Sequence, residues 1–300
     1  MPTLLETLST DLAAAAETAG RATVAVHARR RIPASGILWR PALVVATHHT
    51  VHKDDDVRIT LDGGATARAT VVGRDPGTDL VVLRLDGETG TPATVAREPL
   101  RVGQLGLALG RPGDAVTAAL GVVSAVGPAW RTWHGGEIDQ FVRLDVSVYD
   151  GFSGGPLADA AGRVLGVNTS ALARAAAVTI PAATVDRVVD QLLAGGRVRR
   201  GYLGIGTQPV RLPDAVQAQL GGQQTALMLV ALEPGAPAEQ GGLLLGDVLV
   251  ALGARPTLDV DDVLAALGGD TVGQQVDARI LRAGELRTVP VTIGDAPARR

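Results

Sequence analysis

The sequence predicts a mainly β chain, with two packed β-barrels of about six strands each followed by a smaller β-rich module. Two features of the composition favour this fold class. The chain has 38 glycines and 17 prolines among 300 residues, which suits many turns and few long helices. Hydrophobic residues form 46% of it but aromatic residues only 2%, so aliphatic side chains must fill the core. The third observation is that short apolar runs fall into two groups of about six along the first part of the chain.

Charge and cysteine content exclude several function classes. A formal net charge of −3 argues against nucleic-acid binding, because such proteins carry a basic surface. The chain has no cysteine, which excludes disulfides, thiolate catalysis and thiolate metal sites. We expect no metal and no cofactor.

The first 20 residues lack the pattern of an export signal. They have no basic start followed by an apolar stretch, and they carry Glu6, Asp11 and Glu17 instead. No window of about 20 apolar residues suits a membrane span. We therefore expect no membrane span, and a cytoplasmic chain as the sequence is written, or an exported one if a leader has been trimmed.

Leucine and alanine at helical spacing predict an amphipathic helix over residues 3–18, packed on the body of the protein or on a partner subunit. Alternating and continuous apolar runs then predict the strands of the first barrel. Their ranges are Ala22–His27, Gly36–Trp39, Ala42–Ala46, Val57–Leu61, Ala65–Val72 and Leu80–Leu85.

A second set of apolar runs predicts the second barrel. Their ranges are Leu105–Leu109, Val116–Val126, Ile138–Val146, Gly155–Ala158, Val164–Val167 and Ala175–Ile180. The range Pro181–Gly195 follows as a closing helix with an apolar face and two glycines at its end. The connector Gly127–Gly136 holds Trp130, Trp133 and His134, and both packing of a loop and a contact role remain open for it.

The second module begins at Gly201, where a glycine-rich strand entry runs to Gly206. Later apolar runs predict further strands, and Leu258–Leu267 has the apolar face of a helix. We therefore divide the chain into residues 1–198, which hold the N-terminal helix and both barrels, and residues 199–295, which form the second module.

The stretch Tyr149–Leu157 places Ser153 in a glycine-rich turn between apolar runs. Glycine permits backbone conformations that a Cβ forbids, so the serine hydroxyl can face a substrate. The backbone N–H groups of Gly151 and Ser153 can converge on one point and form an oxyanion hole. Glycine and serine also make ordinary hairpin turns, so a catalytic interpretation needs a base and a carboxylate elsewhere.

Candidates for both exist upstream. Two adjacent histidines, His48 and His49, lie at a predicted strand end and form a candidate base site. A metal site there is disfavoured, because neighbouring positions on an extended chain point to opposite faces. Asp79 enters an apolar strand, where a partly buried carboxylate needs a partner. Asp75 precedes a proline and suits a turn, so we prefer Asp79 as the acid.

A histidine, an aspartate and a serine together predict nucleophilic hydrolysis. An imidazole, whose ordinary pKa is about 6.5, can accept the serine proton during attack. The carboxylate holds the ring in the required tautomer and stabilises the imidazolium. The order His49, Asp79, Ser153 along the chain is the order found in double-barrel serine proteases.

These motifs resemble the HtrA/DegP group of trypsin-like serine proteases with a PDZ domain. The family's histidine motif is similar to Val44–Val51, and its aspartate motif to Asp75–Leu80. Its serine motif is similar to Gly151–Leu157. The resemblance covers residues 20–293 and selects His49 over its neighbouring histidine.

The resemblance implies a serine endopeptidase that hydrolyses peptide bonds of unfolded or misfolded proteins, with a role in protein quality control and stress response. Its catalytic residues would be His49, Asp79 and Ser153, and its oxyanion hole the amides of Gly151 and Ser153. The segment Asn168–Ala171 and Val148 would line the pocket for the residue before the cleaved bond. Because this pocket lacks an acidic side chain, we expect cleavage after small aliphatic residues.

The second module resembles the family's PDZ domain through Arg200–Ile205 and Gly241–Leu249. The resemblance implies that peptide C-termini bind the backbone N–H groups of one loop and add as a strand. The loop residues are Tyr202, Leu203, Gly204 and Ile205. The predicted helix Leu258–Leu267 would form the other wall of the groove, and the connector Gly127–Gly136 would sense an activating peptide.

Two departures from the family lie beside the serine. Asp150 and Phe152 flank Gly151 where the family has Asn-Pro-Gly-Asn, and Asp150 places a negative charge near the oxyanion site. The alternative function is therefore a catalytically impaired, HtrA-like pseudoprotease that acts as a peptide-binding or holdase module. The N-terminal segment lacks the aromatic residues that support trimers in the family, so a homo-oligomer is left open.

Overall fold

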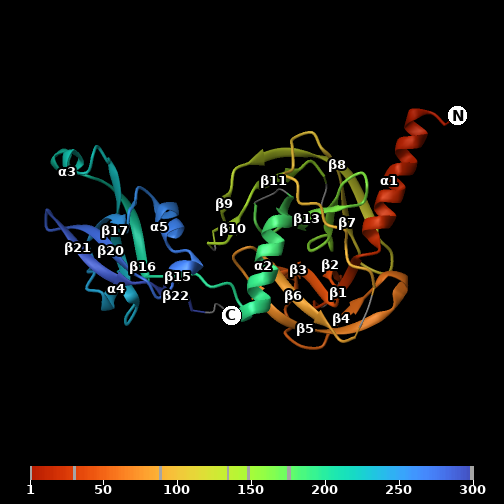
Figure 1. The fold of residues 1–300 in the computed structure, drawn as a ribbon, viewed down its shortest axis with the longest axis horizontal. Helices are drawn as coiled ribbons and strands as arrows, with labels where there is room; N and C mark the ends of the chain where they lie inside the picture. Colours follow the sequence, from red (N-terminus) through yellow and green to blue (C-terminus); the bar gives the residue numbers. More distant parts are fainter. Residues whose placement is uncertain are drawn as a thin grey trace. The chain divides into compact units, whose positions relative to one another are not determined.

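A computed structural model describes residues 2–29, 32–87, 90–133, 135–146, 149–173 and 177–297 (Figure 1). Their contacts divide the chain into two compact units, Met1–Val198 and Arg199–Arg300. The first unit contains two closed six-stranded barrels, and the second a mostly antiparallel sheet with short helices. The prediction of a mainly β fold with two barrels is confirmed.

The first barrel closes in the strand order β1-β2-β3-β6-β5-β4. Its strands are β1 (Thr23–His27), β2 (Ala34–Arg40), β3 (Leu43–Thr47), β4 (Val57–Thr60), β5 (Thr66–Asp75) and β6 (Leu80–Leu85). Two single turns of 3₁₀ helix follow β3 and β4, at His48–Thr50 and Asp62–Gly64. The first of these carries the candidate base.

Strand β3 shows why these strands are apolar on both faces. Val44 and Ala46 point into the barrel, where they pack with residues such as Leu83. The intervening Leu43 and Val45 belong to a second cluster, which joins both barrels to a helix. Because successive side chains of a strand alternate between its faces, a strand covered on both sides needs a continuous apolar run.

The second barrel closes in the order β11-β14-β13-β12-β7-β8. Its strands are β7 (Leu105–Gly110), β8 (Thr117–Gly127), β11 (Phe141–Leu144), β12 (Pro156–Ala158), β13 (Val164–Thr169) and β14 (Val178–Pro181). A small hairpin of β9 (Trp130–Arg131) and β10 (Glu137–Ile138) stands outside the barrel order. Every residue of β12, β13 and β14 is buried, so this side of the barrel is a rigid support for the serine turn.

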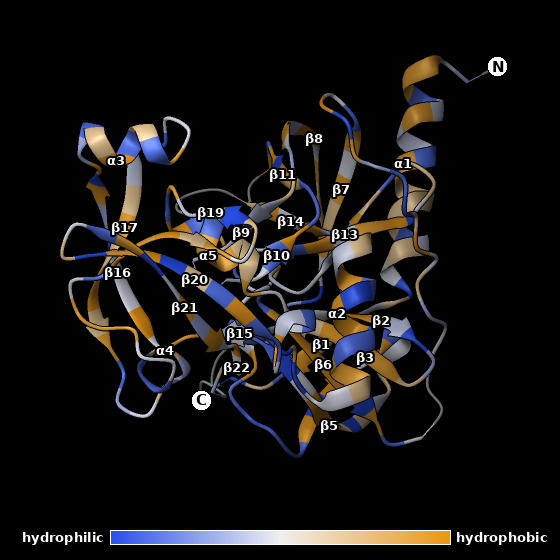
Figure 2. Cartoon of the chain, turned by 60° about the vertical axis from the view of Figure 1, so that its left-hand side comes forward, coloured by the Kyte–Doolittle hydropathy of each residue, from blue (hydrophilic) through white to orange (hydrophobic). Residues whose placement is uncertain are grey.

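Two helices complete the first unit. Helix α1 (Leu4–Gly20) begins with a capping box between Thr3 and Glu6, and buries Ala15 and Ala19 beside β7 and β12. Hydrophobic residues continue toward its N-terminal end, where Leu4 and Leu5 are exposed (Figure 2). Of the two packing modes expected for this helix, its C-terminal half therefore shows packing on the body.

Helix α2 (Ala182–Gly195) holds the two barrels together. Its buried face contains Val185, Val188, Val189 and Leu192, in one cluster with residues of β3, β6 and β13. Gly196 ends the helix in the left-handed conformation at φ 70° and donates to the carbonyl of Leu192 at 2.8 Å. The predicted closing helix is thus present almost to the residue.

The second unit is built on the sheet order β16-β17-β18-β20-β21, with β19 pairing β18 and β15 pairing β22. Its strands are β15 (Gly201–Tyr202), β16 (Ile205–Arg211), β17 (Thr225–Leu232), β18 (Val248–Leu252), β19 (Arg255–Pro256), β20 (Gln275–Arg282), β21 (Glu285–Thr292) and β22 (Gly294–Asp295). Its helices are α3 (Asp214–Gln219), α4 (Pro237–Gln240), α5 (Val260–Ala266) and a 3₁₀ turn at Gly269–Thr271. Strand β16 forms an edge of this sheet.

Three elements differ from the sequence predictions. The strand expected over Ile138–Val146 is interrupted, because Asp139 and Gln140 turn to bond residues of other segments. The helix expected from Leu258 begins at Val260, after Asp259 caps it. Helix α3 was not predicted, since six residues are too few to show a helical period. Residues 175 and 176 of the expected strand Ala175–Ile180 lie outside the described residues.

Candidate active site

The turn between β5 and β6 is shaped by Asp75. Its buried carboxylate accepts hydrogen bonds from the Gly77 amide at 3.1 Å and from the Thr78 hydroxyl at 2.7 Å. Asp79 follows at φ 58°, a left-handed conformation that is uncommon for a residue with a Cβ. The turn therefore stores some strain at Asp79, the residue immediately before β6.

The Asp79 carboxylate is buried and fully engaged. Its Oδ1 accepts from the His49 amide at 2.9 Å, and its Oδ2 from His49 Nδ1 at 2.8 Å. The Thr169 hydroxyl donates to the same Oδ2 at 2.6 Å. Three donors on one carboxylate satisfy a charge that would otherwise be costly to bury.

The structure distinguishes the two adjacent histidines. His49 directs Nδ1 to Asp79, so this nitrogen carries the proton and Nε2 is left as the acceptor. His48 instead has a buried Nδ1 without a hydrogen-bond partner among the described residues. Burial, and then the Arg74 guanidinium, lower the pKa of His48 below its usual value. The side chain of His48 therefore favours the neutral form.

Ser153 lies in a tight turn that adjoins the first barrel. Phe152 donates its amide to the Tyr149 carbonyl at 3.0 Å, and Gly151 between them has φ 93°. This is the pattern of a type II turn, which needs a glycine at its third position. A Cβ on Gly154 would lie 2.0 Å from the Ser35 carbonyl oxygen and 3.3 Å from the Thr47 nitrogen. The serine turn thus meets the strand end that leads into His49.

The nucleophile candidate has a hydroxyl partner. The Oγ atoms of Ser153 and Ser170 are 3.1 Å apart and share a hydrogen bond. Within the described part of the chain, no hydrogen bond joins Ser153 to His49. The consecutive residues Thr169 and Ser170 therefore contact the acid and the serine, respectively. The structure brings the His49–Asp79 pair together directly and leaves Ser153 bonded to Ser170.

The amides expected to form the oxyanion hole have no acceptor within the part of the chain that the structure describes. Among the described residues, neither Gly151 nor Ser153 donates its backbone N–H to a carbonyl or side chain. The departures from the family pattern are accommodated differently. Phe152 is fully buried and packs edge-on against Tyr149, with ring centroids 5.5 Å apart. Asp150 is exposed to solvent, which weakens the effect of its charge on the turn.

The segment expected to line a specificity pocket is only partly free to do so. The Asn168 side chain donates to the Pro156 carbonyl at 2.9 Å and accepts from Thr179 at 2.8 Å, both inside the barrel. Val148 lies outside the described residues. Ala171 remains as a small residue of this segment beside the serine. No group of three or more His, Asp or Glu in the described ranges could hold a metal ion.

The connector Gly127–Gly136 contacts the turn that carries Asp79. The Thr132 hydroxyl donates to the Gly77 carbonyl at 2.6 Å, and Gly136 packs so closely that a Cβ would lie 2.1 Å from Gly77. Trp130 packs on Phe141 with ring centroids 5.7 Å apart, whereas Trp133 is 97% exposed. Packing of the loop thus describes Trp130, a contact role for Trp133 stays an expectation, and His134 lies outside the described residues.

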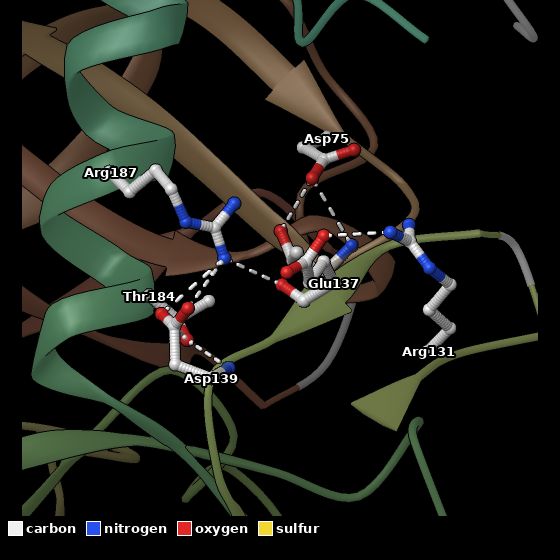
Figure 3. A network of polar contacts seen from close by, with 7 residues as sticks. Asp75, Arg131, Glu137, Asp139, Thr184 and Arg187 are labelled. Carbon is white, nitrogen blue, oxygen red and sulfur yellow. Dashed lines mark hydrogen bonds and ion pairs between the residues drawn. The ribbon is translucent and has the colours of Figure 1, made fainter. Parts of the chain in front are cut away.

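The end of the hairpin is also tied to α2 (Figure 3). Arg131 pairs with Glu137 at 2.9 Å, and Arg187 donates to the Glu137 carbonyl at the same distance. The Thr184 hydroxyl donates to Asp139 at 2.6 Å. The helix that joins the barrels therefore also anchors the connector.

The predicted peptide-binding loop of the second unit has open amides. Gly204 has φ 73°, and a Cβ there would lie 2.2 Å from the Ala236 Cβ. The carbonyls of Leu203 and Gly204 accept from Ala238 and Glu233, while their own amides donate to no acceptor among the described residues. The Tyr202 hydroxyl donates to the Glu233 carboxylate. Ile205 then begins the edge strand β16.

Sequence reasoning missed four polar residues that support the site. Thr169 and Ser170 were considered only for substrate specificity, although two hydroxyls after a buried strand were a usable signal. Ser35 and Arg111, discussed below, lie in segments without a motif, and each contacts residues more than 70 positions away. Nothing in a single sequence marks such contacts.

Two family models match the chain. A trypsin-like peptidase domain matches residues 34–167, and a PDZ domain matches residues 201–293. His49, Asp79 and Ser153 all lie within the first match.

Curated relatives are similar over most of the chain. A protein of Chlamydia trachomatis named "Probable periplasmic serine endoprotease DegP-like" is 33% identical over 268 residues, 87% of this chain and 53% of its own length. Proteins of the same name from Brucella suis and Halomonas elongata are 32% and 33% identical, over 90% of this chain and 54% and 57% of theirs. The chain thus spans about half the length of these relatives.

Solved structures share the fold over nearly the whole chain. The HtrA-type protease AlgW with tripeptide has a TM-score of 0.77 at 26% identity, covering 96% of this chain and 98% of that one. The serine endoprotease from Yersinia pestis has a TM-score of 0.79 at 24% identity, covering 99% and 100%.

The expectation of a cytoplasmic chain is wrong. The relatives carry names that place them in the periplasm, which points to export. The absence of an export pattern in the first 20 residues was weak ground, because it depends on where the given sequence begins. None of the helices in the described ranges combines the length and apolar composition that crossing a membrane requires.

Proposed function

The chain belongs to the HtrA-type group of trypsin-like proteases with a PDZ domain, and from this premise we propose that it is a serine endopeptidase. Ser153 is the nucleophile, His49 the general base and Asp79 the residue that orients the imidazole. The observation that carries the proposal is the His49–Asp79 pair, in which Nδ1 meets the carboxylate at 2.8 Å and Nε2 is left free to accept a proton.

Catalysis then follows from the arrangement of these groups. Ser153 turns its hydroxyl from Ser170 to His49 Nε2, which takes the proton as Oγ attacks the peptide carbonyl. The amides of Gly151 and Ser153 stabilise the negative oxygen of the tetrahedral intermediate. The imidazolium next gives its proton to the leaving amine, and water hydrolyses the acyl-enzyme.

The proposed substrates are unfolded or misfolded proteins, cleaved after small aliphatic residues. An extended peptide suits a binding site between two barrels, and the segment Asn168–Ala171 contains no acidic side chain. The second unit recruits substrates or regulates the peptidase by binding peptide C-termini. A terminal carboxylate would meet the open amides of Leu203 and Gly204, while the peptide adds to the edge of β16.

Casein hydrolysis by matched serine variants tests the catalytic assignment. Ser153→Ala should abolish cleavage, because loss of a triad member costs several orders of magnitude in kcat. Ser124→Ala removes a hydroxyl on β8 that bonds the Arg143 carbonyl, and should leave cleavage unchanged. Cleavage that survives Ser153→Ala would reject the assignment. A folded wild-type protein without any cleavage would favour the pseudoprotease alternative.

Fluorescence anisotropy with a labelled peptide tests the recruitment site. A peptide with a free C-terminal carboxylate should bind, and the same peptide as a carboxamide should bind at least about tenfold more weakly, since charged hydrogen bonds are the stronger kind. Equal binding of both forms would show that the Leu203–Gly204 amides do not recognise the carboxylate.

A further inference from the structure

A buried serine on the first barrel contacts the turn that carries the nucleophile. Ser35, on β2, is fully buried, and its hydroxyl donates to the Gly151 carbonyl at 2.6 Å. Its backbone N–H donates to the Ser153 carbonyl at 3.2 Å. Resting on the function proposed above, we infer that Ser35 is a positioning residue, which fixes the two amides of the oxyanion hole through the peptide unit that lies between them.

The geometry of three successive peptide units carries this inference. The N–H groups of the proposed hole belong to the peptides Asp150–Gly151 and Phe152–Ser153. The peptide between them, Gly151–Phe152, is held at both ends: its carbonyl accepts from Ser35, and its N–H donates to Tyr149. Because peptides are planar, fixing the central unit leaves only the torsions at Gly151 and Phe152 to set the direction of each donor.

Those two torsions are themselves restricted by packing. Gly151 is confined by Pro112, whose Cβ would lie 2.7 Å from a Cβ on the glycine. Phe152 is fully buried beside Gly110, where a Cβ would lie 2.7 Å from the aromatic ring. The hydrogen bond from Ser35 is therefore the polar contact that selects one orientation of the turn within a tight apolar surround.

Arg111 sets the direction of the Ser35 hydroxyl. The Arg111 backbone N–H donates to Ser35 Oγ at 2.7 Å, so the hydroxyl proton is left to point at Gly151. The Arg111 side chain is only 3% exposed, and its guanidinium donates to four separate groups. These are the carbonyls of Thr23, Gly20 and Asp114 and the carboxylate of Asp62. The donor to Ser35 is thereby anchored to helix α1 and the first barrel.

Two substitutions at Ser35 and a control separate positioning from general stability. Ser35→Ala removes the donor and leaves the Gly151 carbonyl buried without a partner. Ser35→Cys keeps the shape of the side chain with a much weaker donor. Thr60→Val is the control, because Thr60 is buried and its hydroxyl shares a hydrogen bond of 2.9 Å with His27 Nε2, between β1 and β4.

The measurements are kcat and KM for a peptide substrate, inhibition by a peptide aldehyde, and thermal unfolding of each variant. A peptide aldehyde forms a tetrahedral adduct whose oxygen occupies the hole, whereas KM reports mainly on ground-state contacts. Ser35→Ala should lower kcat about 10- to 100-fold. This fall is no larger than the one expected when a complete oxyanion-hole donor is removed. Aldehyde affinity should fall by a similar factor, KM should change less than about threefold, and Ser35→Cys should lie between.

The outcomes distinguish the inference from the function on which it rests. A folded Ser35→Ala with wild-type kcat and aldehyde affinity overturns the inference alone. An equal loss of kcat in Thr60→Val also overturns it, because the effect would then follow stability. A wild-type protein that neither turns over peptide nor binds the aldehyde overturns the proposed function and the inference with it. If Ser35→Ala does not fold, Ser35→Cys decides: lowered kcat with unchanged KM supports positioning, and unchanged kcat overturns it.

Discussion

The Ser153 hydroxyl shares its hydrogen bond with Ser170 before any substrate is present. Attack requires that Ser153 donate to His49, so a bond that Ser153 donates to Ser170 must first be lost, whereas one that Ser153 accepts from Ser170 can remain. Ser170 therefore competes with the base in the arrangement in which Ser153 is the donor. It also lies next to Thr169, which holds the carboxylate of the His49–Asp79 pair.

Removal of this competitor should speed acylation. A neutral hydrogen bond is worth about 0.5–1.5 kcal/mol, which corresponds to about a 2- to 10-fold change in rate. We predict that Ser170→Ala raises kcat/KM for a rapidly acylating ester by that factor, measured under pseudo-first-order conditions. Ser170→Thr keeps the hydroxyl and should resemble the wild type. A lower rate in Ser170→Ala would show instead that Ser170 helps to orient the nucleophile.

For single residues, sequence motifs pointed to more of the candidate site than hydrophobic periodicity did. The sequence named His49, Asp79 and Ser153 because each stands in a recognisable pattern at a strand end. It could not name Thr169 as a donor to Asp79, since the two are 90 positions apart. Such contacts depend on how two barrels pack, which local patterns do not encode.

Among the elements, the β9–β10 hairpin contacts the turn that carries the acid. The Thr132 hydroxyl donates to the Gly77 carbonyl and accepts from the Gly136 amide, so it joins the hairpin to the Asp75–Asp79 turn. A conformational change in the hairpin can thereby shift Asp79 through this turn, without any contact between the hairpin and the substrate.

Thr132→Val should loosen this coupling while keeping the side-chain shape. It leaves the Gly77 carbonyl without its donor, which costs about 1–3 kcal/mol when the group stays buried. We predict a several-fold lower kcat and a lower melting temperature, measured by peptide hydrolysis and differential scanning calorimetry. Thr132→Ser retains the hydroxyl and should restore kcat. If Thr132→Val lowers the melting temperature but leaves kcat unchanged, the hairpin supports only the fold.

The elements themselves followed largely from apolar patterning. Helix α2 was predicted from its apolar face and its terminal glycines, because both signals are local. The predicted strand Ile138–Val146 was wrong near its start, because Asp139 and Gln140 bond Thr184 and Leu100 rather than continue the ladder. Local hydrophobicity does not show that two neighbouring polar residues will form hydrogen bonds with another segment.

For the whole molecule, two partly buried histidines predict a pH dependence of stability. The pKa of His48 is lowered by burial and then by Arg74, and that of His27 by burial and then by Arg58. Asp79 and Asp75 near His48, and Asp114 near His27, oppose these shifts only in part. The folded protein therefore binds fewer protons at these sites than the unfolded chain.

The sign of the effect follows from this difference. Stability is lost as pH falls below about 6.5, where the unfolded histidines take up protons that the folded ones resist. We predict that the melting temperature falls between about pH 6.5 and pH 5. His48→Asn should flatten this dependence, while the exposed His52→Asn serves as control. A melting temperature that stays level or rises on acidification in this range would contradict the account.

For the whole molecule, composition predicted the mainly β fold class correctly, because many glycines and few aromatic residues suit short strands with aliphatic cores. Cellular location was predicted wrongly, since it depends on segments at the ends of a chain and not on its fold.

The most direct test of the proposed nucleophile is the mass of the protein after reaction with a fluorophosphonate probe, followed by peptide mapping. We predict one adduct, on the peptide that contains Ser153, and none in Ser153→Ala. An unmodified wild-type protein, or an adduct on another residue, would contradict the claim that Ser153 is the activated nucleophile.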